Sequence, residues 1–154
     1  MNKWICFAYK GEKNLAEWLA TLPVSIFVCD YDHNAPTVEH LQATHYPLYE
    51  VIRERNSSLP YIMLIQPNYW TALRNRESVL KRLDVVVAPY LKARQSGDEN
   101  VYFIDRLSFL SGEPLYENTM DASYPNAAGF LRMAEGIVTV IRHILERETE
   151  KSLR

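Results

Sequence analysis

Short apolar runs of strand length alternate with longer segments of helical periodicity along almost the whole chain. Strands are expected at Trp4–Tyr9, Val24–Cys29, Tyr61–Ile65 and Val101–Ile104. Helices are expected between and after them, at residues 12–22, from 36 to about 56, at 71–96 and at 125–148. This alternation is typical of β-α-β units that build a parallel sheet. The sequence therefore predicts an α/β fold.

Two of the predicted helices contain residues that can interrupt the helix or destabilise its end. Pro89 lies inside the third predicted helix, where a kink or a break is expected. The tail from Glu146 to Arg154 is highly charged and is expected to fray or to stay exposed. The last helix has one apolar stripe with helical spacing, made of Phe130, Ala134, Ile137, Val138, Ile141 and Leu145.

Length and charge restrict the class of protein. A chain of 154 residues suits a single domain, here residues 1–154, and its net charge of -2 predicts no nucleic-acid partner and no anionic membrane surface. No segment has the roughly 20 apolar residues of a transmembrane helix, and the first residues do not form a signal peptide. A cytoplasmic location is the default expectation. Cys6 and Cys29 lie in apolar runs and are expected to be buried free thiols.

The polar segment Asp30–Asn34 directly follows a predicted strand. Ligands of open α/β sheets bind beyond the carboxyl ends of the strands, which is where this segment should lie. Asn34 could donate its side-chain amide to an oxyanion in acyl transfer, could cap the helix that starts at Pro36, or could do both. Asp30, Asp32 and His33 are not expected to bind a metal, because adjacent residues of an extended chain point in opposite directions.

A second polar segment, from Asp121 to Gly129, precedes the last helix. An Asp three residues before a side chain at a helix entry can orient that side chain, as hydrolases require of a general base. Position 124 is Tyr, whose hydroxyl is protonated at neutral pH and is therefore a poor base. The alternative is a capped loop with a buried Tyr124 hydroxyl bonded to Asp121. Gly129 can let the helix approach the sheet closely.

Three histidines lie on predicted helices. His45 is on the apolar stripe of its helix, His40 is outside it, and His143 lies one residue from the stripe of the last helix. All three are interpreted as structural, since a catalytic base would need a nucleophile beside it.

Taken together, these segments resemble the SGNH (GDSL-type) hydrolase family of serine esterases, lipases and acylhydrolases. The closest resemblance is to the branch called GDSL-like lipase/acylhydrolase family 3. Four stretches of sequence carry it: VSIFVCDYDHNAPTVEHLQAT at 24–44, GDENVYFID at 97–105, TMDASYPNAAGFLRMA at 119–134, and the weaker KGE at 10–12. The resemblance spans nearly the whole chain and implies a flavodoxin-like three-layer α/β/α sandwich.

The resemblance also implies site residues. In the family, a Ser in a GDS-type motif on the first strand is the nucleophile. A Gly and an Asn complete its oxyanion hole, and an Asp-x-x-His pair supplies the base. Asn34 matches the family Asn as an oxyanion-hole donor, Asp121 matches the orienting acid, and Tyr124 stands at the position of the His. No Gly-Asp-Ser occurs in the chain, and no glycine of the chain is matched to the oxyanion Gly.

These differences limit the expected activity. Loss of the Ser or the His of such a unit costs roughly 10⁶ in kcat, because the two act together. The expected function is an ester hydrolase, with esterase or acylhydrolase activity on a small ester such as an O-acetylated carbohydrate, in truncated or diverged form. The alternative is a catalytically inactive domain with a degenerate active site, retained for binding or assembly. No cofactor is expected.

The resemblance also implies a gap in the sheet, because the chain starts near the second strand of the family. The first strand of the family lies at the sheet centre, and neighbouring strands lie about 4.8 Å apart. Either the predicted strand at Trp4–Tyr9 pairs directly with the one at Val24–Cys29, or a second chain supplies a strand and a homo-oligomer completes the sheet.

Overall fold

A parallel sheet organises the described part of the chain. The computed structural model describes residues 12–65, 75–106, 109–110, 117–120 and 124–153. Strands β1 (Phe27–Cys29), β2 (Tyr61–Leu64) and β3 (Val101–Ile104) lie in the order β1-β2-β3, and both neighbouring pairs are parallel. Phe27 faces Tyr61, which in turn faces Val101. The expected α/β fold with a parallel sheet is confirmed.

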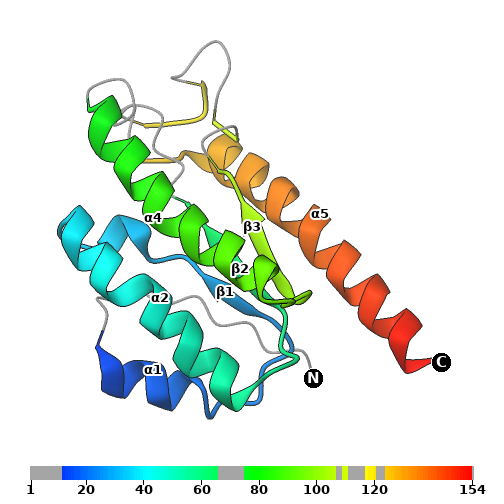
Figure 1. The fold of residues 1–154 in the computed structure, drawn as a ribbon. Helices are drawn as coiled ribbons and strands as arrows, with labels where there is room; N and C mark the ends of the chain where they lie inside the picture. The colour runs from blue at the N-terminus through cyan, green and yellow to red at the C-terminus, as the bar shows by residue number, and fades with distance from the viewer. Residues whose placement is uncertain (1–11, 66–74, 107–108, 111–116, 121–123, 154) are drawn as a thin grey trace.

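Helices cover both faces of this sheet (Figure 1). One face packs against α1 (Lys13–Leu19), α2 (Val38–Arg55) and α4 (Arg76–Gln95), and the other packs against α5 (Ala127–Ser152). The larger core lies on the three-helix side, whereas Ile26, Ile62, Leu64, Ile104 and Ile144 form the core beneath α5. The strands are buried on both faces, which explains their continuous apolar sequences.

Several expected boundaries shift. α1 ends at Leu19 and β1 starts at Phe27, so both are shorter than their apolar patterns. The expected strand at Trp4–Tyr9 and the start of the third helix at Thr71–Arg74 lie outside the described residues. Of the kink or break expected at Pro89, the break does not occur: α4 continues through this buried proline, because packing against α2 and the sheet outweighs the lost hydrogen bond.

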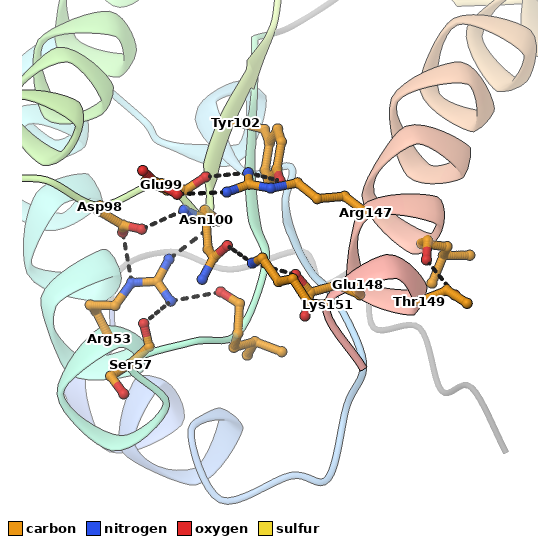
Figure 2. Close-up of polar contacts among 12 residues, drawn as sticks. Arg53, Ser57, Asp98, Glu99, Asn100, Tyr102, Arg147, Glu148, Thr149 and Lys151 are labelled. Atoms are coloured by element: carbon orange, nitrogen blue, oxygen red, sulfur yellow. Dashed lines mark hydrogen bonds and ion pairs between the residues drawn. The ribbon is translucent and has the colours of Figure 1, made fainter. Parts of the chain in front are cut away.

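Arg53 joins the elements at the amino ends of β2 and β3 (Figure 2). Its Nε lies 2.8 Å from Oδ2 of Asp98, and its Nη1 donates to the carbonyls of Ser57 and Leu59. The ion pair has little exposure, with 14% and 12% of the two side chains accessible. Arg53 therefore fixes the turn before β2 to the turn after α4.

The charged end of α5 is attached to the same edge, so of the two outcomes expected for the tail, fraying or exposure, the structure shows exposure on a continuous helix (Figure 2). Arg147 donates to Oε2 of Glu99 at 2.8 Å and to the hydroxyl of Tyr102 at 3.1 Å. Lys151 donates to Oδ1 of Asn100 at 3.3 Å. These contacts hold the helix as far as Ser152, although most of its last residues remain exposed, as expected. This edge serves the architecture and lies opposite the carboxyl ends of the strands.

Candidate functional site

The carboxyl ends of the three strands form the edge at which a ligand of this fold binds. β1 continues into Asp30, β2 into Ile65, and β3 into Asp105 and Arg106. The predicted Asp30–Asn34 segment thus lies at this edge, as the sequence indicated. Within the described residues, no three His, Cys, Asp or Glu side chains are grouped so that they could hold a metal ion.

Asn34 ends a short 3-10 turn that follows β1. The turn spans Asp32–Asn34, and the backbone N–H of Asn34 donates to the carbonyl of Tyr31 at 2.9 Å. The expectation that Asn34 caps α2 is wrong. Thr37 is the N-cap, and its Oγ1 accepts from the backbone N–H of His40 at 3.1 Å. The side chain of Asn34 is exposed and, among the described residues, is not used by the helix.

Arg82 of α4 holds the backbone on both sides of Asn34. Its Nη1 donates to the carbonyl of Asp32 at 2.6 Å, and its Nη2 donates to the carbonyl of Ala35 at 2.9 Å. A planar guanidinium with two donors in a fixed fork restrains both ends of such a loop at once. The turn that carries Asn34 is therefore fixed in place before any ligand arrives.

Arg106 fixes the start of the same loop. Its Nη1 donates to Oδ2 of Asp30 at 2.8 Å, its Nη2 pairs with Oδ1 of Asp30, and its Nε donates to the carbonyl of Ile65. One guanidinium thus connects the residues that follow all three strands. Only 3% of the Arg106 side chain and 25% of the Asp30 side chain are exposed.

Neither arginine was predicted from the sequence. A signal for Arg106 exists, since it is a cation two residues after a buried strand, at the edge where Asp30 follows another strand. Arg82 lies within a helix among other charged residues, and nothing in its sequence context separates it from them. Only the tertiary structure reveals its partners.

The described residues on either side of the start of the second predicted segment pair with each other just before α5. Thr119 and Pro125 form an antiparallel bridge, and the N–H of Met120 donates to the carbonyl of Tyr124 at 2.9 Å. Tyr124 is 62% exposed, so the alternative of a buried tyrosine is wrong. Asp121 lies outside the described residues, so its role as orienting acid stays a prediction.

Asn126 and Gly129 set the entry to α5. Asn126 is the N-cap, and its Oδ1 accepts from the N–H of Gly129 at 3.1 Å while its Nδ2 donates to the carbonyl of Glu117 at 2.7 Å. A Cβ at Gly129 would lie 2.1 Å from the carbonyl oxygen of Asn118. The close approach expected at Gly129 is therefore made to the loop rather than to the sheet.

His45 lies inside the core. It is 1% exposed, stacks on Tyr31 with ring centroids 5.8 Å apart, and its Nε2 lies 3.9 Å from Sγ of Cys29. Burial lowers its pKa to about 4. His45 and the free thiol of Cys29 are both inside the core, as predicted, and neither can reach a substrate at the surface. His143 is exposed and His40 half-buried.

The chain was also compared with known proteins. No protein-family model matches it, and no curated protein matches it. Among solved structures, a GDSL-like lipase from Bacteroides ovatus ATCC 8483 is similar over 89% of this chain, with 26% identity and a TM-score of 0.74. The salicylyl-acyltransferase SsfX3 from a tetracycline biosynthetic pathway is similar over 84% of this chain, with 20% identity and a TM-score of 0.70.

These similarities settle the fold. The chain has the flavodoxin-like α/β/α arrangement of a GDSL-like protein, as its sequence predicted. It spans only 41% of the lipase chain and 40% of the acyltransferase chain. Among the described residues, no helix is both long enough and apolar enough to cross a membrane.

Proposed function

We propose that this chain is an SGNH-type (GDSL) ester-hydrolase domain, in truncated or diverged form, that contributes the oxyanion-binding part of an acyl-transfer site. The observation that carries this proposal is the similarity to a GDSL-like lipase over 89% of the chain, at 26% identity, together with Asn34 just beyond the carboxyl end of β1. Its substrate would be a small ester, such as an O-acetylated carbohydrate.

The structure around Asn34 suits an oxyanion donor. Such a donor acts best when it is held in place before the reaction, because no reorganisation is then needed as charge develops. Arg82 restrains the backbone on both sides of Asn34, and the pair of Asp30 and Arg106 restrains the start of the loop. Asn34 itself is exposed, so a ligand can reach its side chain.

The rest of the catalytic set is proposed from the sequence. Asp121 is assigned as the orienting acid. Tyr124, three residues later in the sequence, stands at the position of the family His and is exposed. The sequence contains no Gly-Asp-Ser, so the nucleophile of a complete site would come from outside this constellation. Among the described strands β1 pairs only with β2, which leaves room for a second copy to supply a strand, but that copy has the same sequence and brings no Gly-Asp-Ser.

Hydrolysis of p-nitrophenyl acetate tests the assignment. Removal of one oxyanion donor typically costs 10²–10³ in kcat, so any turnover of this chain in excess of buffer should be lost in Asn34→Ala. Asn14→Ala, which removes an exposed asparagine from α1, is the matched control and should leave the rate unchanged. Turnover that persists in both Asn34→Ala and Asp121→Ala would exclude the assigned site.

A catalytically inactive domain is the second candidate. The exposed Tyr124 in place of a base, and the absence of a serine motif, favour it. It predicts no esterase activity and no labelling by a fluorophosphonate, which reacts with activated serines. A single stoichiometrically labelled serine, identified by peptide mass spectrometry, would exclude this candidate and would locate the nucleophile.

A further inference from the structure

Helix α5 has a second apolar surface in addition to the face that packs on the sheet. Ile144 is fully buried under the helix, and Ile137 and Val140 pack beside it on the same face. In contrast, Leu131 is 60% exposed and Val138 is 45% exposed. Of the apolar stripe predicted from the sequence, Ile137 therefore faces the sheet, whereas Val138 is uncovered.

A row of apolar residues that begins on this uncovered surface and runs to the margin of the sheet-facing side has the spacing of a coiled-coil seam. Its residues are Leu131, Ala134, Val138, Ile141 and Leu145, and we call these five residues the α5 seam. The steps along it are three, four, three and four residues, which is the repeat that allows two helices to pack with knobs into holes. Ile141 and Leu145 lie where the seam meets the sheet-facing side, and with Val138 they line a shallow hollow along the helix.

Charged residues beside the seam indicate which partner fits. Glu135 and Arg142 follow Ala134 and Ile141 directly, so they occupy equivalent places seven residues apart on one flank of the seam. Both side chains are exposed, and the described residues offer neither of them an ion pair. In an antiparallel pair of identical helices, Glu135 of each copy lies opposite Arg142 of the other, so two reciprocal ion pairs form.

We propose that the α5 seam is a homodimer interface at which two copies of this chain pack α5 against α5 in antiparallel orientation. Val138 of one copy packs against Ile141 of the other, and Ala134 packs against Leu145. The flanking Glu135 and Arg142 set the orientation, because a parallel pair would not bring their opposite charges together reciprocally. In this antiparallel pair the two α5 helices run alongside each other from Leu131 to residue 148, a length of about 27 Å.

This interface is a single helix pair, so its area falls at the low end of the range for protein–protein contacts, and association in the micromolar range is expected. A membrane surface is a poorer partner, because Glu146 and Glu150 border the same hollow and would face anionic lipid headgroups. The proposal does not depend on esterase activity.

Sedimentation equilibrium of the full chain, from low to high micromolar concentration, tests the dimer. The wild type should show reversible monomer–dimer association, and Leu131→Glu/Val138→Glu should be monomeric throughout. Glu135→Arg places like charges opposite each other at both symmetric sites, so it should weaken association by about tenfold. Glu135→Arg/Arg142→Glu exchanges the charges and should restore it.

Glu54→Arg makes the same charge change on the exposed surface of α2 and should have no effect. A wild type that stays monomeric at all concentrations overturns the proposal. A dimer that is insensitive to the seam and charge variants overturns it equally. Circular dichroism of each variant confirms that a monomer is still folded.

Disulfide crosslinking tests the orientation. Ala134→Cys mixed with Leu145→Cys should form a mixed disulfide dimer, because these positions face each other in the antiparallel pair. Ala134→Cys alone should not crosslink, since its two copies would lie about 16 Å apart along the helices, beyond the reach of a disulfide. Crosslinking of Ala134→Cys alone, in excess of that of the wild type, would show a parallel pair and contradict the proposal.

Discussion

The contact between Asp30 and Arg106 can be tested by a double-mutant cycle. Arg106→Met keeps the length of the side chain and removes its charge, and Asp30→Asn keeps the shape of its partner. Arg106 connects the residues after all three strands, so the cycle measures how firmly the candidate site is anchored. The arginine is almost completely buried, with 3% of its side chain exposed, whereas Asp30 is 25% exposed.

The burial of the two partners sets the expected magnitude. Removing one member of a fully buried ion pair typically costs 3–5 kcal/mol, mostly because the other charge is left without a partner. In Arg106→Met the remaining carboxylate still contacts water, but the carbonyl of Ile65 also loses its donor, so we expect a loss of about 3 kcal/mol. Asp30→Asn should cost a similar amount, because it leaves the buried guanidinium without a counter-charge.

The double variant should cost less than the sum of the two single variants. We expect a coupling energy of about 2 kcal/mol from urea unfolding with a constant m-value. The control is the cycle for Glu77 and Lys81, an exposed pair on α4 with N and O atoms 2.8 Å apart, for which the coupling should be much smaller because solvent screens both charges. If the Asp30–Arg106 coupling is no larger than that of the exposed pair, the anchoring role of Arg106 is wrong.

Two further perturbations test the core and the entry to α5. Burial lowers the pKa of His45 from 6.5 to about 4. Between these pH values the unfolded chain binds a proton that the folded chain does not bind. The free energy of unfolding should therefore fall by about 3 kcal/mol as the pH falls from 6.5 to about 4. His45→Gln should remove this dependence in acid-unfolding curves, and an unchanged slope would contradict it. Gly129→Ala places a Cβ 2.1 Å from the carbonyl oxygen of Asn118 and should lower the free energy of unfolding in urea by more than about 2 kcal/mol. The control, Thr139→Ala on the exposed face of α5, should lower it by less than about 0.5 kcal/mol. Equal effects of these two variants would exclude the close approach.

The architecture was largely predictable from local sequence, because its signals are short-range. Continuous apolar runs identified β2 and β3 nearly to the residue. Where the local sequence left two outcomes open, a distant contact decided between them. α4 continues through Pro89, and the charged end of α5 is held by residues 99–102, neither of which has a trace in the neighbouring sequence.

The candidate site was predictable only in part. Asn34 was found because it follows a strand in a distinctive stretch of sequence, and its place at the carboxyl edge is confirmed. Its role as a helix cap was wrong, since Thr37 offers a hydroxyl directly at the start of α2. The arginines that hold the loop come from 47–76 residues away in sequence, and single-sequence patterns do not encode such pairings. The placement of Asp121 is outside the described residues and stays a prediction.

The most direct test of the oxyanion assignment is the rate of p-nitrophenyl acetate hydrolysis by the wild type, Asn34→Ala and Asn14→Ala, each relative to buffer. A site that lacks its serine and its histidine retains only the residual catalysis of oxyanion binding, so the wild type should exceed buffer by a modest factor. We predict that this excess is lost in Asn34→Ala and preserved in Asn14→Ala. An excess of equal size in wild type and Asn34→Ala would contradict the assignment of Asn34 as the oxyanion donor.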